Sequence, residues 1–292
     1  MKILICGANG QLGIELQEAL RSGKTDLGKL PSIYENAMVM CTDVEELDIT
    51  NEDEVQIFFK AGAFDLVINC AAMTNVDGCE DHEELAFRVN ACGAQNLARA
   101  AQSIGAKMVQ ISTDYVFSGN EGKEYVETDT PDPQSAYGRT KHVGEEYVLG
   151  ACSTSFVVRT AWLFGASGPN FVLTMMRLAR ENGQITVVND QFGNPTYAND
   201  LAYEILKIAS TEDYGVYHCT NRGICSWYEF ASAIVDAAGI ECSKTACTTE
   251  EFKRPAPRPA YAPLRNKRLE DTIGDEMRSW QDALVAYIGK LQ

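Results

Sequence analysis

The run Gly7-Ala8-Asn9-Gly10-Gln11-Leu12-Gly13 follows a short apolar stretch, Lys2–Cys6, and precedes a segment of helical periodicity. A glycine-rich turn between a strand and a helix is where many proteins bind the pyrophosphate of a dinucleotide. Gly7 permits the tight turn, Gly10 lets a pyrophosphate approach the backbone, and Gly13 lets the helix lie close to the strand. A turn without a ligand is the alternative, but the context of this run favours nucleotide binding.

The same alternation of short apolar runs and helical segments continues to about residue 160. Strands are predicted at Lys2–Cys6, Ala37–Cys41, Leu66–Cys70, Lys107–Ser112 and Ser155–Arg159. Helices are predicted at Gln11–Ser22, Asp53–Lys60, Glu83–Ile104 and Ser135–Leu149. Strands separated by helices of this length pair in parallel through right-handed crossovers. The sequence therefore predicts an α/β fold with a doubly wound parallel sheet of the Rossmann type.

The second half of the chain is richer in glycine and proline, as in Phe192–Thr196 and Arg254–Pro259. Helices are predicted there at Phe171–Glu181, Asp200–Ala209, Trp227–Ala238 and Ser279–Leu291. We expect residues 1–160 to form an NAD(P)-binding domain and residues 161–292 to form a smaller substrate-binding lobe at the carboxyl edge of the sheet. The boundary is soft, and chain segments can interleave across it.

Composition limits the possible partners and the cellular compartment. The 292 residues carry a net charge of −16 without a block of Lys and Arg, which argues against nucleic acid and anionic membranes as partners. We identify no signal peptide and no apolar run of the length that a membrane span needs, so we expect a cytoplasmic protein. Ten cysteines without a CxxC pair and three scattered histidines predict reduced thiols and no metal site. An anionic substrate would need a local arginine.

Tyr137 and Lys141 are four residues apart, which places both side chains on one face of the predicted helix. A lysine ammonium in that position can lower the pKa of the tyrosine and also reach the ribose of a nicotinamide cofactor. An ordinary solvated helix face is the alternative. Two features argue against it: Thr113 ends a strand with a hydroxyl that can bond a substrate carbonyl, and Asn69–Ala72 ends another with residues small enough for a cofactor to pack closely.

The choice between NADH and NADPH depends on the end of the second strand. Asp43 and Asp48 both follow that strand, and an acid there would bind the ribose 2′-hydroxyl and repel a 2′-phosphate. Lys24 and Lys29 lie in a nearby loop that could fold over the same place. The sequence leaves both cofactors open.

These motifs resemble those of the extended short-chain dehydrogenases, and within them the family of dTDP-4-dehydrorhamnose reductases. The resemblance runs almost end to end, through Gly7–Gly13, Cys70–Asp77, Ser112–Phe117, Tyr137–Lys141, Arg159–Gly165, Asn170–Val172, Val188–Thr196 and Arg258–Pro259. The glycine run and the Tyr-Lys run are shared by many relatives. The Arg-Thr-x-Trp and Asp-Gln-Phe-Gly-x-Pro-Thr runs are more specific to this group.

The resemblance implies a role for each matching residue. The catalytic residues would be Thr113, Tyr137 and Lys141. The cofactor would contact Gly7, Asn9, Gly10, Gln11, Leu12, Gly13, Asp48, Ile49, Cys70, Ala71, Ala72, Thr74, Tyr137 and Lys141. A dTDP-linked 4-keto deoxysugar would contact Thr74, Asn75, Val76, Asp114, Tyr115, Trp162 and Arg258. The implied reaction is reduction of the 4-keto group by NADPH or NADH to give dTDP-L-rhamnose, a precursor of surface polysaccharide.

Several positions depart from the family pattern. Ala262 stands where a serine is common, and Arg265 where an acidic or neutral residue is usual. Glu15 matches one carboxylate of a magnesium-bridged dimer found in some members, but the segment near Asn199 lacks the glutamate that would complete it. We therefore expect no metal, and a monomer or weak homodimer.

Three alternatives stay open on the sequence. One is a nucleotide-sugar epimerase, another is a reductase of a different 4-keto sugar, and the third is a non-catalytic regulatory subunit like that of methionine adenosyltransferase. The intact Thr113, Tyr137 and Lys141 argue against the regulatory subunit.

Overall fold

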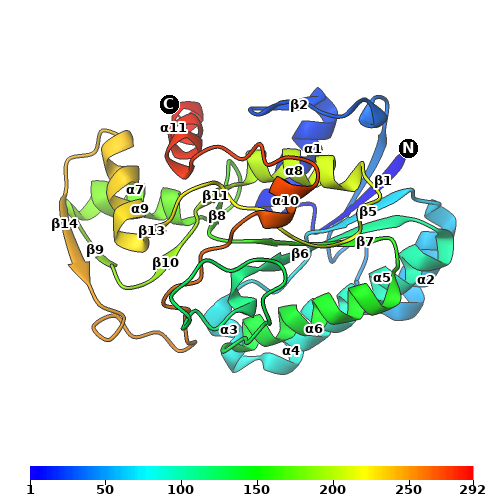
Figure 1. The fold of residues 1–292 in the computed structure, drawn as a ribbon, viewed down its shortest axis with the longest axis horizontal. Helices are drawn as coiled ribbons and strands as arrows, with labels where there is room; N and C mark the ends of the chain where they lie inside the picture. The colour runs from blue at the N-terminus through cyan, green and yellow to red at the C-terminus, as the bar shows by residue number, and fades with distance from the viewer. Residues whose placement is uncertain (292) are drawn as a thin grey trace.

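The computed structural model describes residues 1–291, and its centre is a sheet of six parallel strands in the order β12–β7–β6–β5–β1–β4 (Figure 1). In chain order these strands are β1 (Lys2–Cys6), β4 (Met38–Thr42), β5 (Leu66–Asn69), β6 (Lys107–Thr113), β7 (Ser155–Thr160) and β12 (Gly215–His218). The predicted doubly wound parallel sheet is confirmed.

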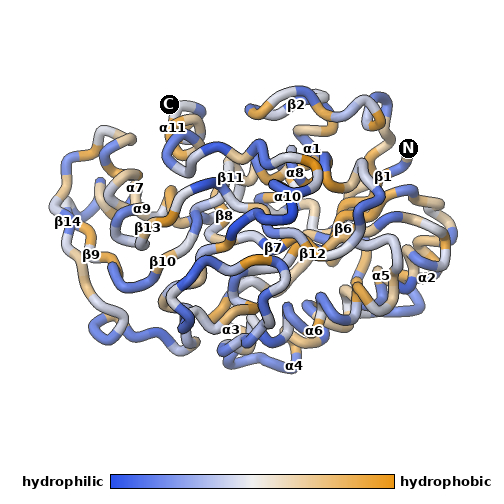
Figure 2. The backbone as a smooth tube through the Cα atoms, viewed as in Figure 1, coloured by the Kyte–Doolittle hydropathy of each residue, from blue (hydrophilic) through white to orange (hydrophobic). Residues whose placement is uncertain are grey.

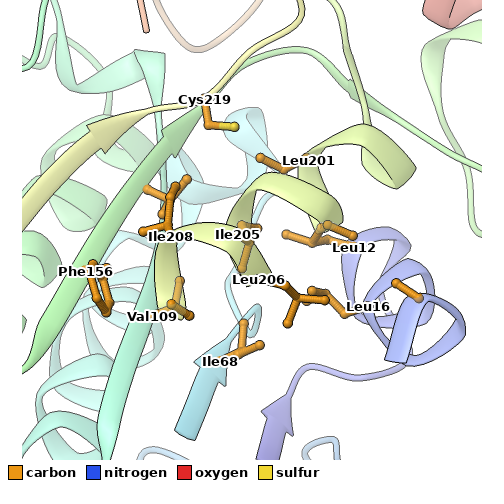
Figure 3. Close-up of a cluster of buried hydrophobic side chains, with 14 of the residues drawn as sticks. Leu12, Leu16, Ile68, Val109, Phe156, Leu201, Ile205, Leu206, Ile208 and Cys219 are labelled. Atoms are coloured by element: carbon orange, nitrogen blue, oxygen red, sulfur yellow. The ribbon is translucent and has the colours of Figure 1, made fainter. Parts of the chain in front are cut away.

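Helices cover both faces of the sheet (Figure 1). One face carries α1 (Gln11–Ser22) and α8 (Ala198–Ala209), and the other carries α2 (Glu52–Gly62), α5 (Ala94–Ile104) and α6 (Ala136–Ala151). Figure 3 shows the first interface, where Leu12 and Leu16 of α1 meet Leu201 and Ile205 of α8 above Ile68 of β5. This burial fixes α1, and with it the glycine turn, against the sheet.

The second half of the chain adds a smaller lobe at one end of the sheet (Figure 1). It contains α7 (Phe171–Asn182), α9 (Trp227–Ala237), α11 (Trp280–Leu291) and three strand pairs: β9 (Gln184–Val188) with β14 (Ser243–Cys247), β8 (Leu163–Phe164) with β11 (Thr196–Tyr197), and β10 (Phe192–Gly193) with β13 (Cys225–Ser226). The remaining elements are β2 (Lys24–Thr25), β3 (Gly28–Lys29), η1 (Ser32–Tyr34), α3 (Val76–Asp81), α4 (Glu83–Phe87), η2 (Arg88–Gly93), η3 (Asp114–Val116) and α10 (Lys267–Asp271). Figure 2 shows hydrophobic residues along central strands such as β6, while the outer loops are largely hydrophilic. In residues 1–291, no helix combines the length and the apolar character needed to cross a membrane.

The single helix predicted over residues 83–104 is interrupted, because η2 is a π-helical turn between α4 and α5. Asn90 in this turn accepts a hydrogen bond from the Met73 N–H (2.8 Å) and donates to the Met73 carbonyl oxygen (3.2 Å). α6 packs closely here, since a Cβ atom at Gly144 would lie 2.3 Å from the Asn90 carbonyl oxygen. The turn thus joins the loop after β5 to the helix that carries Tyr137 and Lys141.

Two elements of the second half return to the first half. β12 pairs with β7, with His218 opposite Arg159, and α8 packs against α1. The sequence pattern did not reveal β12, because a four-residue strand carries too short a pattern to recognise. The division of the chain into two domains at residue 160 stays a prediction. Strands from both sides of this position belong to the central sheet.

Candidate active site

A cleft runs along the carboxyl ends of the central strands, where open α/β sheets bind their ligands. It consists of a lobe-side cavity of about 440 Å³ and an edge cavity of about 410 Å³, which share Gly10, Cys70 and Ala72. The predicted site residues that line one or both cavities are Gly7, Gly10, Gln11, Leu12, Gly13, Asp48, Ile49, Cys70, Ala71, Ala72, Thr74, Val76, Thr113, Asp114, Tyr115, Tyr137, Lys141 and Trp162. Asn9, Asn75 and Arg258 line neither cavity.

The glycine turn has little room for side chains. Gly7 has a φ of 70°, and a Cβ atom there would lie 2.5 Å from the backbone nitrogen of Ala71. A Cβ atom at Gly13 would lie 2.6 Å from the Gly7 carbonyl oxygen. α1 begins at Gln11 and its N-cap, Gly10, makes no side-chain hydrogen bond, so the first-turn amides can bind an anion. These features fit the pyrophosphate of a dinucleotide.

Two acids follow β4 beside the edge cavity, and only one contacts the glycine turn. Asp43 Oδ2 accepts a hydrogen bond from the Asn9 N–H at 3.2 Å. Asp48 Oδ1 instead accepts from the N–H and the hydroxyl of Thr50, at 2.9 and 2.8 Å, within its own loop. Asp43 therefore occupies the strand-end position at which an acid meets the adenosine ribose.

The β2–β3 hairpin, which carries Lys24 and Lys29, does not cover the edge cavity. It packs beside α8, where the Asp26 N–H donates to Asn199 Oδ1 at 2.9 Å. Neither lysine lines the cavity. The loop considered in the sequence as a possible phosphate-binding segment thus lies elsewhere.

The three predicted catalytic residues meet in the lobe-side cavity. Thr113 ends β6, and its hydroxyl donates to Asp114 Oδ1 at 2.9 Å. Lys141 Nζ donates to the Ile111 carbonyl oxygen at 2.6 Å. The Tyr137 ring stands edge-on to Tyr115, with centroids 5.5 Å apart. β6 and α6 together therefore place a hydroxyl, a phenol and an amine around one space.

Burial controls the protonation of these groups. It lowers the pKa of Lys141 to about 8, although the nearby Glu145 charge opposes this change. It raises the pKa of Tyr137 above its ordinary value, and the Thr113 hydroxyl acts in the opposite direction. Burial is the largest influence on the pKa of Tyr137 in this structure, and the expected lowering of that pKa by Lys141 stays a prediction. A phenol that keeps its proton suits a proton donor.

The lobe end of the same cavity carries the predicted sugar-binding residues Thr74, Val76, Asp114, Tyr115 and Trp162. Two other predicted contacts are engaged within the protein. Asn75 caps α3 by accepting from the Gly78 N–H at 3.0 Å, and Arg258 pairs with Asp77.

Trp162 is held in a strained conformation. Its φ of 46° lies in the left-handed region, which side-chain-bearing residues rarely adopt. Its indole is stacked on Trp227, with ring centroids 3.5 Å apart, and a Cβ atom at Gly193 would lie 2.6 Å from the same ring. These two stacked indoles, called the indole wall below, both line the lobe-side cavity.

Sequence reasoning missed several lining residues. One of them is Trp227, which begins α9 directly after the capping residue Ser226. A tryptophan at the start of a predicted helix was the sequence feature that could have indicated it. Val44 and Leu85 line the edge cavity and are exposed to solvent, at 68% and 42%. Large apolar side chains exposed beside the glycine turn fit the faces of an adenine ring.

Buried polar atoms without a partner gather in the cleft. In residues 1–291 these atoms include Gln11 Oε1, Ser112 Oγ and Thr160 Oγ1, which belong to residues lining the lobe-side cavity, and Thr42 Oγ1, which belongs to the edge cavity. Buried polar groups normally find partners, so this concentration indicates that a ligand supplies them. The residues present therefore fit a dinucleotide spanning both cavities.

The positions that depart from the family pattern lie away from the reacting groups. Ala262 is buried in a small apolar cluster, where a hydroxyl would need a partner. Arg265 is half exposed and pairs with Glu270 at 2.8 Å. Glu15 is buried, and its Oε2 accepts from Asn199 Nδ2 at 2.9 Å.

Comparisons with known proteins agree with this geometry. A family model described as the RmlD substrate binding domain matches residues 1–292. The chain is 40% identical to the spore coat polysaccharide biosynthesis protein SpsK of Bacillus subtilis, over 98% of this chain and 96% of that protein. It is 38% identical to a dTDP-4-dehydrorhamnose reductase of Mycobacterium tuberculosis, over 97% of this chain and 91% of that protein.

Solved structures show the same relationship. A dTDP-4-dehydrorhamnose reductase from Clostridium acetobutylicum has a TM-score of 0.94 at 49% identity, with all of both chains covered. One from Bacillus anthracis, in complex with NADP, has a TM-score of 0.92 at 41% identity, with 99% of both chains covered. A UDP-glucose 4-epimerase from Thermus thermophilus has a TM-score of 0.79 at 20% identity, covering 99% of this chain and 98% of that one, and shares the fold alone.

Proposed function

The chain belongs to the RmlD family, and we propose that it is an NAD(P)H-dependent reductase that converts the 4-keto group of dTDP-4-dehydro-β-L-rhamnose into the hydroxyl of dTDP-L-rhamnose. One observation carries this proposal. Thr113, Tyr137 and Lys141 line a single cavity that continues into the glycine turn. A bound nicotinamide cofactor would supply the hydride, and the groups around the cavity manage the proton and the substrate.

Tyr137 is the proposed proton donor. Its phenol stays protonated in the buried site, and transfers its proton as negative charge develops on the substrate oxygen. The Lys141 ammonium supports this transfer from one helical turn away and orients the cofactor ribose. Gly7, Gly10 and Gly13 leave room for the pyrophosphate at the start of α1.

Thr113 is the proposed second contact to the substrate oxygen. The Tyr115 N–H donates to Thr113 Oγ1 at 3.2 Å, which fixes the oxygen of this hydroxyl. Its proton points to Asp114 in the structure, at 2.9 Å, and would turn to the substrate oxygen when the sugar binds. Trp162 and Trp227 would lie against the apolar face of the sugar or the base.

The decisive measurement is oxidation of NADH or NADPH with a panel of dTDP-linked 4-keto sugars. We expect turnover with dTDP-4-dehydrorhamnose, and we expect Tyr137→Phe to lose nearly all of the rate while it still binds the cofactor. Wild-type turnover by that variant would exclude Tyr137 as the donor. Reduction of a different keto sugar, or tightly held NAD without net turnover, would favour the other reductase or the epimerase. Binding to a synthetase without turnover would favour the regulatory subunit.

Location and assembly are also proposals. Ten unpaired cysteines suit a reducing compartment such as the cytoplasm. A monomer or weak homodimer without a bridging metal is expected, because the Glu15 carboxylate is used within the chain by Asn199. Sedimentation with and without Mg²⁺ tests this expectation, and a metal-dependent dimer would contradict it.

A further inference from the structure

A buried ion pair on α6 and β7 has no part in the proposed reaction. Tyr137, Lys141 and Glu145 are spaced four residues apart along α6 and share one face of the helix. Arg159 Nε and Nη2 donate to the two carboxylate oxygens of Glu145, at 2.8 and 2.7 Å. Glu145 is 2% exposed and Arg159 is 3% exposed. A fully buried carboxylate therefore lies one helical turn beyond the catalytic lysine.

Arg159 is held in place by further contacts. Its Nη1 atom lies 3.4 Å from Nε2 of His218, whose Nδ1 atom lies 3.1 Å from the Tyr125 carbonyl oxygen. Burial, together with the Arg159 charge, lowers the pKa of His218 to about 3, so this ring is neutral. Nδ1–H then donates to Tyr125, and Nε2 accepts from Arg159. The guanidinium also lies 5.1 Å from the centre of the Phe117 ring, which stacks on Tyr125.

Stability alone does not account for this arrangement, because well-packed apolar residues often replace a buried ion pair without loss. We infer that Glu145, oriented by Arg159, is a positioning residue that keeps the proton on the buried Lys141. The inference rests on the proposed function, in which the Lys141 ammonium orients the cofactor ribose. Arg159 fixes the Glu145 carboxylate through two hydrogen bonds, and the negative charge of Glu145 favours the protonated form of Lys141.

The surroundings of Lys141 support this role. α6 presents Tyr137 and Glu145, the end of β5 presents Cys70, and β6 presents the Ile111 carbonyl oxygen, at 2.6 Å from Nζ. Burial raises the pKa of the Cys70 thiol, so this group is neutral at physiological pH. Within residues 1–291, no titratable side chain of α3, α4 or α5 contributes to the pKa of Lys141. Glu145 is thus the anion that opposes burial of the ammonium.

The charge on Glu145 is itself secured by its neighbours. Burial would raise its pKa, but the hydrogen bonds from Arg159 and His142 and the Arg159 charge lower it to about 2. Glu145 is therefore ionised throughout the neutral range. By contrast, Glu146 on the same helix is 64% exposed, and its Oε1 atom lies 3.8 Å from Nε2 of His142.

The test compares Glu145→Gln with the matched control Glu146→Gln. Affinity for NADH, measured by fluorescence without sugar, and the rate of ketoreduction are followed across pH. In the wild type both should fall as the pH rises through the pKa of Lys141, about 8. In Glu145→Gln the fall should move to lower pH by at least about one unit, because a nearby opposite charge is lost. Glu146→Gln should match the wild type, and Glu145→Asp should restore part of the range.

If NADH affinity and the rate of ketoreduction fall at the same alkaline pH in Glu145→Gln as in the wild type, the inference is overturned. If this variant does not fold, Glu145→Gln/Arg159→Gln replaces it, since it leaves no unpaired buried charge. If binding and rate in the double variant fall at the same pH as in the wild type, the inference is likewise overturned. A wild type that binds NADH but reduces no keto sugar would contradict only the proposed function. The pH dependence of NADH binding would still test the inference, because that measurement contains no sugar.

Discussion

Arg258 and Asp77 form a two-pronged ion pair, with Nη1 2.9 Å from Oδ1 and Nη2 3.0 Å from Oδ2. The pair joins the proline-rich loop of the second half to α3 beside the lobe-side cavity. The hydrogen bond from Arg258 is the main cause of the lowered pKa of Asp77. The guanidinium that was predicted to contact the dTDP-linked sugar is thus occupied by a carboxylate, which the diphosphate of such a substrate would have to displace.

Removing that competition should strengthen diphosphate binding. Asp77→Asn should bind dTDP roughly two- to five-fold more tightly, because a partly exposed ion pair contributes ~0.5–1 kcal/mol. Arg258→Met should weaken binding roughly ten-fold or more, because it removes hydrogen bonds to a charged group. Calorimetric titration measures both. Thymidine is the control ligand, and equal tightening of thymidine would show that Asp77 acts other than through the phosphates.

Asp43 should set the cofactor preference. Its carboxylate ends β4 and is anchored to the glycine turn through the Asn9 N–H, where it would repel a 2′-phosphate. We expect the wild type to favour NADH, and Asp43→Ala to shift the ratio of kcat/KM values towards NADPH by roughly ten-fold or more. Glu45→Gln is the matched control, since Glu45 is an exposed acid of the same loop that lines neither cavity. An unchanged ratio in Asp43→Ala would exclude this role.

Asp114 should make folding stability depend on pH. Burial raises its pKa from 3.8 to about 7, against the hydrogen bond from Thr113. Between these values the folded protein binds more protons than the unfolded chain, so wild-type stability falls as the pH rises through this window. Asp114→Asn avoids this loss, and its advantage should grow with pH to at most roughly 4 kcal/mol.

Urea unfolding of Asp114→Asn and the wild type, at pH values from about 4 to about 8, measures the difference. Asp81→Asn, at an exposed position, provides the control. A flat difference for Asp114→Asn would mean that its carboxyl titrates like a solvated one.

Gly193→Ala should disturb the indole wall. The new Cβ atom would lie 2.6 Å from the Trp162 ring, so this ring would have to shift from its present position on Trp227. We expect kcat/KM for the sugar nucleotide to fall roughly ten- to hundred-fold, while NADH binding is unchanged. Gly289→Ala is the matched control, because a Cβ atom there meets nothing within 4 Å. Equal kinetics for the two variants would contradict a role for the wall in substrate binding.

Local patterns predicted much of the fold, because each strand and helix of the central sheet leaves a periodic signal. Lys2–Cys6 and Gln11–Ser22 have the predicted bounds. The π-helical turn at 88–93 was missed, since helical periodicity does not register one extra residue in a turn. The Tyr137–Lys141 spacing located the candidate catalytic pair for the same local reason.

Long-range relationships could not be read in the same way. Asp77 and Arg258 are 181 residues apart, and nothing near either residue indicates the other. The raised pKa of Tyr137 depends on burial by several elements rather than on Lys141 one turn away. Trp227 belongs to the cleft only because its helix begins against Trp162.

The place of β12 at the edge of the sheet has a consequence for biosynthesis. β7 has been made once residue 160 leaves the ribosome, but its outer edge stays unpaired until Gly215–His218 follows. Arg159 likewise waits for His218, so its buried charge is not fully coordinated on the nascent chain. The sheet that carries the glycine turn therefore lacks its last edge strand until residue 218 has been synthesised, and we expect the contacts around Arg159 to be completed only then.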